Sequence, residues 1–403
     1  MSGHGGPVAC RSCCRPMTAA AILPPARRRF AKISQMKEEG RFRFLMWWER
    51  QANLVSDFGA SGDGIANDSW ALQAAIEAVA ARGGGEILIP PLTFGIGTPV
   101  RFRDCVTLVG CGTPPSGAGG NPPFVGSCFK AIASMPAMFT QADLSSPLHS
   151  IGMRRCTVDA GQANGLRVNN AVLMSFVNSR FTQNFFRQGT GTGFTDKFNP
   201  RGTAWINWFS ENYVEFFNVG VLWEGSDSFI HHNYISSCLS YNMIIDSTGG
   251  NQITGNQIDG CGRNNLTHTT NRNAVALLMR NTHYKSKQTR NVLTGNHFGE
   301  NQANDIRIED FSGGGTMDAG HVITGNLFHN LPGNSIHIGE GNRGGVIMGN
   351  DFSDIGDGSG CVVFNGDSSK SPGWSLGPNS FSNGDFGLKY VNVPAGTTLL
   401  GQT

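Results

Sequence analysis

Three copies of one motif decide the fold of this chain: ITGNQI at residues 253–258, LTGNHF at 293–298 and ITGNLF at 323–328. A near match, IMGNDF, follows at 347–352. The shared feature is an asparagine followed two residues later by Val, Ile or Phe. From about residue 205 onward it recurs with spacings of 21, 23, 40, 30, 24 and 29 residues, at Asn212, Asn233, Asn256, Asn296, Asn326, Asn350 and Asn379.

A repeat of this length cannot bury its own apolar side, whereas stacked repeats share one continuous core. Asn tolerates the left-handed backbone of a sharp corner, and its amide can bond to the Asn above and below. A variable period with a constant corner is typical of a parallel β-helix, because insertions collect in its loops. A leucine-rich horseshoe or a propeller would keep a stricter period. We therefore predict an all-β, single-stranded parallel β-helix, a solenoid.

Composition agrees with many short strands. The 403 residues include 55 Gly, and only 15% of them are charged, which argues against a mostly helical chain. A hydrophobic content of 39% with 26 Phe is enough for a long core and argues against disorder. A net charge of +2 lacks the basic excess expected of a nucleic-acid partner. No run of about 18 apolar residues occurs, so no membrane span is expected.

The chain divides into three predicted parts. Residues 1–50 form a basic leader, expected to be disordered or loosely packed. Residues 51–115 form an N-terminal cap with the first turns, including a helix within SWALQAAIEAVAARGGG (69–85) that Asp68 or Ser69 can cap. Residues 116–403 form the remaining β-helix, with loop insertions near 186–205, 263–273 and 282–291.

The segment 55–100 carries a family resemblance. Its residues Asp57-Phe58-Gly59-Ala60, Gly62-Asp63-Gly64 and Asn67-Asp68, then the helix, then Ile89-Pro90-Pro91 and TLVGCG (107–112), resemble the opening of the pectate-lyase-like superfamily. The resemblance implies a right-handed β-helix plugged by a short capping helix, with Asp63 and Asp68 as turn and capping residues. It covers roughly residues 55–400 and is specific for fold.

The resemblance implies action on carbohydrate, because the superfamily includes polysaccharide lyases, glycoside hydrolases, epimerases and phage tailspike depolymerases. It also implies an extracellular or virion-associated setting and a homotrimer. The chain lacks the polygalacturonase set (Asn-Thr-Asp, Asp-Asp, Gly-His-Gly, Arg-Ile-Lys), the clustered Asp ligands of calcium-dependent pectate lyases and an epimerase-like Asp-Pro-His-Glu. No subfamily chemistry therefore transfers, and no cofactor or metal is predicted.

Stacking places one column of polar residues on successive strands. Aligning VLWE (221–224), MIID (243–246), ALLMR (276–280) and IRIE (306–309) puts Glu224 beside Asp246, followed by Arg280 and Glu309. Strands are about 4.8 Å apart, which brings the two carboxylates to about 5 Å, close to the spacing in retaining glycosidases. A solvated acid–base ladder satisfied by Arg280 is the alternative.

A second column contains Glu215 and Asp259, two turns apart and therefore about 9–10 Å from each other. That is the upper edge of the separation used by inverting glycosidases. Four aromatic residues are candidates for sugar binding: Trp205, Trp223, Tyr213 and Tyr234. Trp223 can equally pack in the core, and Tyr213 and Tyr234 can equally be exposed corner residues that pack on a neighbour in a trimer.

Cys238 and Cys261 fall in one inward column on adjacent turns, which permits a disulfide or a buried thiol stack. The predicted function is binding and cleavage of a polysaccharide along a lateral groove, by hydrolysis in preference to elimination. A glycan-binding shaft without catalysis, resembling a tailspike or adhesin, is the alternative. A purely structural solenoid would bind no glycan.

Overall fold

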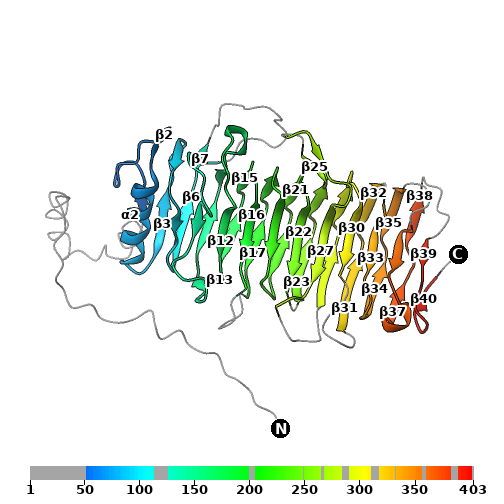
Figure 1. Ribbon diagram of the computed structural model, residues 1–403. Helices are drawn as coiled ribbons and strands as arrows, with labels where there is room; N and C mark the ends of the chain where they lie inside the picture. Colours follow the sequence, from blue (N-terminus) through cyan, green and yellow to red (C-terminus); the bar gives the residue numbers. More distant parts are fainter. Residues whose placement is uncertain are drawn as a thin grey trace, which may run out of the picture.

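The computed structural model describes residues 51–112, 126–198, 205–247, 249–264, 267–283, 290–309, 317–331, 333–355, 360–382 and 389–401. Figure 1 shows a single elongated stack of strands that runs from the helix α2 (Ser69–Ala80) to the last strands near the C-terminus. Successive turns add strands to three long parallel sheets in the order A, B, C. The parallel β-helix predicted from the Asn repeats is confirmed.

Sheet A has thirteen strands within the described residues: β1 (Gln51–Asn53), β3 (Gly85–Leu88), β6 (Val106–Val109), β10 (Gly152–Arg154), β14 (Arg180–Thr182), β17 (Trp208–Ser210), β20 (Phe229–His231), β23 (Gly249–Thr254), β28 (Arg290–Thr294), β31 (Met317–Thr324), β34 (Asn342–Met348), β37 (Trp374–Leu376) and β40 (Thr398–Leu399).

Sheet B has twelve strands over the same described ranges: β2 (Asp63–Asn67), β4 (Thr93–Ile96), β7 (Ser127–Ala131), β11 (Cys156–Asp159), β15 (Phe185–Arg187), β18 (Tyr213–Glu215), β21 (Tyr234–Ser236), β24 (Gln257–Asp259), β29 (His297–Gly299), β32 (Leu327–Leu331), β35 (Asp351–Ile355) and β38 (Ser380–Ser382).

Sheet C has eleven strands in the described part of the chain: β5 (Val100–Arg101), β8 (Phe139–Thr140), β12 (Asn170–Met174), β16 (Thr192–Asp196), β19 (Val219–Trp223), β22 (Tyr241–Asp246), β27 (Val275–Arg280), β30 (Asn304–Ile308), β33 (Ile336–Ile338), β36 (Val362–Phe364) and β39 (Tyr390–Val391). Two small pairs complete the strands: β9 (Leu148–His149) with β13 (Phe176–Val177), and β25 (Arg263–Asn264) with β26 (Thr269–Thr270).

The predicted asparagines form a ladder at the corner between sheets A and B. The Nδ2 group of Asn256 donates to Oδ1 of Asn296 (2.9 Å) and to the carbonyl of Ile230 (2.9 Å). The backbone N–H of Asn256 donates to the same Asn296 oxygen at 3.0 Å. The pattern repeats on every turn to Asn379, and it begins one turn earlier than predicted, at Asn184. The ladder therefore satisfies a buried corner and holds the turns in register.

The core lies inside the three sheets. On the later strands of sheet B, the side chains that point into the core are stacked phenylalanine rings. The ring centroids are 5.1 Å apart for Phe298 and Phe328 and 4.9 Å apart for Phe328 and Phe352. Cys238 and Cys261 are both buried there, and both are free thiols. The thiol alternative is therefore the observed one.

The N-terminal cap is present with a shorter helix than predicted, because α2 ends at Ala80 and a turn leads to Gly83. Asp63 takes its turn role by accepting the N–H groups of Ile65 and Ala66, each at 2.8 Å. Asp68 makes no side-chain cap of the helix. Its carboxylate instead accepts the N–H of Ser61 (2.6 Å), which fastens the Gly-Asp-Gly loop to the helix start.

Part of the insertion expected at 186–205 is regular, because the end of β15 and the whole of β16 lie within it and pair in sheets B and C. The insertion at 263–273 contains the β25–β26 hairpin, which stands out from the stack beside β21 (Figure 1). The leader 1–50 and most of the segment 282–291 lie outside the described residues. Among the helices in the described ranges, none combines the length and apolar character needed to cross a membrane.

Candidate functional site

The first predicted column lies at the carboxyl end of sheet C, where each turn leaves for sheet A. Trp223 pairs with Ile245, and Asp246 pairs with Arg280, so Glu224, Asp246 and Arg280 occupy equivalent places on consecutive strands. Glu309 follows one strand further on, with its N–H bonded to the Met279 carbonyl. The register read from the repeats is therefore confirmed.

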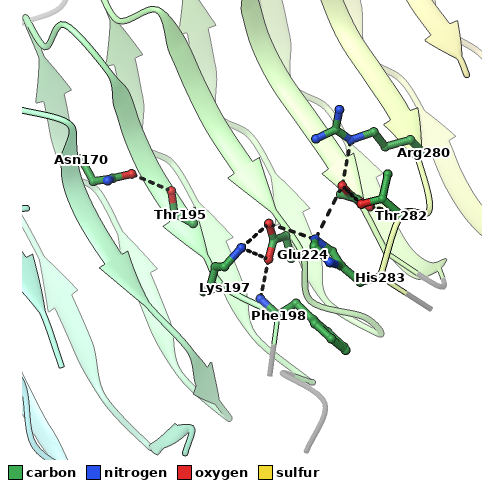
Figure 2. Close-up of polar contacts among 9 residues, drawn as sticks. Asn170, Thr195, Lys197, Phe198, Glu224, Arg280, Thr282 and His283 are labelled. Carbon is green, nitrogen blue, oxygen red and sulfur yellow. Dashed lines mark hydrogen bonds and ion pairs between the residues drawn. The ribbon is translucent and has the colours of Figure 1, made fainter. Parts of the chain in front are cut away.

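Glu224 is surrounded by donors (Figure 2). Lys197 Nζ lies 3.0 Å from Oε1 and 2.9 Å from Oε2, and the backbone N–H of Phe198 donates to Oε2 at 2.7 Å. Lys197 directly follows β16, the strand that precedes β19 in sheet C. The Glu224 side chain is only 3% exposed, whereas that of Lys197 is 36% exposed.

Asp246 is held in the same way one strand further on. Arg280 Nε donates to Oδ2 at 2.8 Å, and Thr282 donates through its backbone N–H to Oδ1 (2.8 Å) and through its hydroxyl to Oδ2 (2.7 Å). The Asp246 side chain is 1% exposed and that of Arg280 is 31% exposed. The predicted Asp246–Arg280 contact is therefore present.

His283 joins the two carboxylates. Its Nε2 lies 3.3 Å from Glu224 Oε1 and 3.7 Å from Asp246 Oδ2, and the imidazole is 28% exposed. One face of the ring stacks on Phe198, with centroids 5.0 Å apart and the planes 12° from parallel. The contacts with two carboxylates and with the Phe198 ring fix the orientation of the imidazole.

The side chains that reach solvent at this site are those of Lys197, Arg280 and His283, and the carboxylates of Glu224 and Asp246 lie beneath them. The two carboxylates predicted as a catalytic pair are therefore covered, because the segments that carry Phe198 and Thr282 bond to them. We call this group of five residues the sheet C site.

The second predicted column lies on the outer face of sheet B. Glu215, Ser236 and Asp259 are register partners on β18, β21 and β24, and Arg187 precedes them on β15. Burial raises the pKa of Glu215 to about 7, against the opposing effects of Arg187 and the Tyr213 hydroxyl. Burial also raises the pKa of Asp259, which accepts Gln257 Nε2 at 2.8 Å and the Tyr234 hydroxyl at 3.3 Å.

The four aromatic residues predicted to bind sugar lie in different environments. Tyr213 and Tyr234 lie on the outer face of sheet B as predicted, but their rings stack on each other, with centroids 4.5 Å apart. The two ring faces that meet in this stack are therefore closed to a sugar. Trp223 is wholly buried in the core, which corrects its assignment to substrate binding. Trp205 is 49% exposed and bridges to Ser226, two residues after Glu224.

Sequence reasoning missed Lys197, Phe198, Thr282 and His283. Lys197 could have been found, because the alignment of sheet C strands extends back one turn and places Lys197 against Glu224. Phe198, Thr282 and His283 lie beyond strand ends, where no repeat position predicts the course of the chain. Trp223 alternates with Val221, so its inward orientation was legible from the strand period.

Comparison with known proteins places the chain in a family. A family model described as rhamnogalacturonase A/epimerase, pectate lyase-like, matches residues 53–258, just over half of the sequence. The chain belongs to this pectate lyase-like family. The resemblance seen in residues 55–100 is thereby confirmed.

Relatives of this pectate lyase-like protein include the mannuronan C5-epimerase AlgE6 of Azotobacter vinelandii, which is 32% identical over 117 residues. The match spans 27% of this chain and 12% of the length of the epimerase.

Two solved structures share the fold. The A-module of the A. vinelandii mannuronan C-5 epimerase AlgE4 has a TM-score of 0.64 at 15% identity, covering 87% of this chain and 100% of the module. A tailspike mutant of the E. coli bacteriophage HK620, in complex with a pentasaccharide, has a TM-score of 0.62 at 15% identity, covering 88% of this chain and 67% of the tailspike. The fold is thus the right-handed parallel β-helix of these proteins.

Proposed function

We propose that this chain modifies an acidic polysaccharide at the sheet C site, through proton transfer by His283 next to a uronate carboxylate. Elimination and epimerisation both begin with this step. The observation that carries the proposal is the position of His283 Nε2, 3.3 Å from Glu224 and 3.7 Å from Asp246, at the partly exposed edge of the site. Histidine is the side chain that most often acts as a general acid or base in enzymes.

The two cations suit the same substrate. A carbanion next to a carboxylate is stabilised when the carboxylate charge is neutralised, and fixed cations supply that stabilisation best. Lys197 and Arg280 each engage a buried carboxylate and carry further N–H groups, since an ammonium has three and a guanidinium five. Their exposed fractions of 36% and 31% leave these groups within reach of a polymer.

Hydrolysis by the Glu224–Asp246 pair is less well supported. A glycosidase acid must reach the glycosidic oxygen, and its partner must reach the anomeric carbon or a water. Both carboxylates are at most 3% exposed, and each is bonded to a cation and a backbone N–H. The sequence favoured hydrolysis by Glu224 and Asp246, and we now favour proton transfer by His283 instead.

The known relatives agree with a polysaccharide substrate. The matched proteins include mannuronan epimerases, and a structural neighbour was solved with a pentasaccharide. Trp205, exposed near Glu224, offers a flat face on which a sugar ring can pack.

The test is incubation of the full chain with a panel of polyuronides: polygalacturonate, polymannuronate and polyglucuronate. We expect new absorbance from unsaturated uronate or a changed epimer ratio by proton NMR, and a loss of at least 100-fold in His283→Gln. The matched control is Glu211→Gln, because the Glu211 side chain is exposed and accepts a single described hydrogen bond, from Gln183 Nε2 at 2.8 Å. Full activity in a folded His283→Gln variant would rule out the assigned role.

A glycan-binding shaft without catalysis is the second candidate. One observation favours it: each buried carboxylate is paired with its own cation. Such pairing is sufficient to fasten two loops to the sheet without any catalytic role. Binding of a polyuronide by the wild-type chain, with no change in the polymer after prolonged incubation, would support this candidate over the first.

A further inference from the structure

We propose that His297 and His329, on the outer face of sheet B, form a binding site for a divalent transition-metal ion, with Cu²⁺ as the preferred occupant. The two residues lie on β29 and β32, which are neighbouring strands of sheet B. The sheet C site lies on a different sheet, so the inference does not depend on the proposed function.

The two imidazoles are in direct contact. His297 Nε2 lies 2.8 Å from His329 Nδ1, and the ring centroids are 4.6 Å apart. Phe298 follows His297 and Phe328 precedes His329, and both phenylalanines point into the core, so both imidazoles lie on the outer face. Each histidine is partly exposed, so an ion in solution can reach it. Imidazole nitrogen is a favoured ligand of copper, nickel and zinc ions, and the pair presents two such atoms side by side.

A glycine makes this contact possible. Gly299 is the register partner of His329, and a Cβ at Gly299 would lie 2.9 Å from His329 Nδ1, closer than the two atoms can approach. The equivalent positions on the four preceding strands of sheet B all carry side chains: Arg187, Glu215, Ser236 and Asp259. The missing side chain at Gly299 therefore leaves the space in which the His329 ring meets His297.

The spacing of the two nitrogens favours an ion that holds its ligands at right angles. With imidazole–metal bonds of about 2.0 Å, two nitrogens 90° apart at the ion are separated by about 2.8 Å. This matches the 2.8 Å between His297 Nε2 and His329 Nδ1. A tetrahedral Zn²⁺ would need a separation of about 3.3 Å. Cu²⁺ prefers tetragonal geometry and binds most tightly among the divalent ions of its row, so it fits this pair best.

Binding moves one proton within the neutral pair and releases none. One of the two facing nitrogens donates the present hydrogen bond, and it must offer a lone pair to the ion instead. The proton moves to the other nitrogen of the same ring, so His297 Nδ1 and His329 Nε2 carry the hydrogens when the ion is bound. The rings are 14° from parallel, so one ring also turns about its Cβ–Cγ bond to direct both lone pairs at one ion.

The surroundings of the pair suit a hydrated cation. Among the described residues, no three His, Cys, Asp or Glu side chains are grouped so that they could hold a metal ion together, so water completes the coordination. Asp259 interacts electrostatically with His297, and its negative charge favours a dication. Glu300 also lies near Asp259, but its contact of 3.6 Å with Arg263 offsets its charge.

A second pair of histidines provides a matched control. His231 ends β20 of sheet A, and its Nδ1 lies 3.1 Å from Nδ1 of His232. The charges near His231 are those of Glu211 and Arg180, which act in opposite directions. This pair therefore lacks the net negative charge that Asp259 supplies to His297.

The experiment titrates the full chain with Cu²⁺, Ni²⁺, Zn²⁺ and Ca²⁺ by isothermal calorimetry. Exposed thiols such as that of Cys111 are alkylated first, because thiolates are also metal ligands. Every chain carries His4→Gln, which removes the histidine nearest the amino terminus as a competing ligand. We expect Cu²⁺ to bind at least 10-fold more tightly than Zn²⁺. Ca²⁺ prefers oxygen ligands and should not compete.

The variants assign the site. His297→Gln and His329→Gln should each lose one equivalent of bound Cu²⁺, whereas His231→Gln should lose none. Gly299→Ala keeps both histidines but places a Cβ against the His329 ring, so it should bind this equivalent at least 10-fold more weakly. Circular dichroism establishes that each variant is folded.

Pulsed electron paramagnetic resonance of the Cu²⁺-loaded chain with both histidines keeps the inference testable should a variant fold poorly. The spectrum should show two imidazole nitrogens bound to one ion. A single bound imidazole, tighter binding of Zn²⁺ than of Cu²⁺, or an undiminished Cu²⁺ equivalent in folded His329→Gln would overturn the inference. Polyuronide chemistry is assayed separately, so its absence would remove the proposed function and leave the metal site to be decided by these titrations.

Discussion

Replacement of Asn296 by alanine is the most demanding test of the stacked architecture. The Asn296 side chain makes four hydrogen bonds. Its Oδ1 accepts the backbone N–H and the Nδ2 of Asn256 at 3.0 and 2.9 Å, and its Nδ2 donates to the Ile253 carbonyl at 2.8 Å and to Asn326 Oδ1 at 3.0 Å. The residue is 1% exposed, so water cannot replace the lost partners.

At about 1 kcal/mol for each buried hydrogen bond, Asn296→Ala should lower the free energy of unfolding by about 4 kcal/mol. This is a large fraction of the stability of a typical domain, about 5–15 kcal/mol. The matched control is Asn379→Ala at the last rung. Asn379 also makes four hydrogen bonds, but it is half-buried and water can satisfy its neighbours. We expect a loss of about 1–2 kcal/mol there.

Equilibrium urea unfolding, followed by circular dichroism in both directions, measures the two losses. A loss below about 1 kcal/mol in Asn296→Ala, or equal losses in the two variants, would refute the reasoning that buried amide pairing holds the turns together.

Two further predictions concern single side chains. His321 is buried, accepts the N–H of Asn291 through Nδ1 at 3.2 Å and has its pKa lowered to about 4 by burial, so the folded chain excludes a proton that the unfolded chain binds below about pH 6.5. The free energy of unfolding should therefore fall by up to about 3 kcal/mol as the pH drops from 6.5 toward 4. Urea titrations at several pH values should show a weaker pH dependence in His321→Asn. The same pH dependence in the variant and in wild type would contradict this prediction. Trp205→Ala should raise KM for the active polyuronide about 10-fold with little change in kcat, and an unaltered KM would remove Trp205 from the binding surface.

The sequence was sufficient for the fold because stacking converts repeat spacing into spatial contact. Once Asn256 and Asn296 were placed on adjacent turns, Glu224, Asp246 and Arg280 followed as neighbours, and the register bears this out. The same logic could have reached Asn184 and Lys197, which lie on earlier turns of the same columns.

The coverage of the site could not be predicted in this way. Glu224 is shielded from solvent by the segment that carries Phe198, whose N–H donates to its carboxylate. Asp246 is shielded by the segment that carries Thr282 and His283. These residues follow strand ends, where chain direction is set by tertiary contacts and not by a repeat. The orientation of aromatic rings could not be predicted either. The repeat spacing predicts that Tyr213 and Tyr234 are neighbours, but not that their rings stack face to face.

Solvent deuterium exchange tests the central claim about His283 most directly. A polyuronide is incubated with the chain in deuterated water, and proton NMR follows the signal of the hydrogen on the carbon next to the carboxylate. Both reactions remove this hydrogen. Epimerisation should replace it with deuterium from the solvent, and elimination should remove its signal as unsaturated ends form. We expect the loss of signal with wild type and Glu211→Gln but not with His283→Gln. An unchanged signal in wild type on all three polyuronides, or equal change in His283→Gln, would contradict the account.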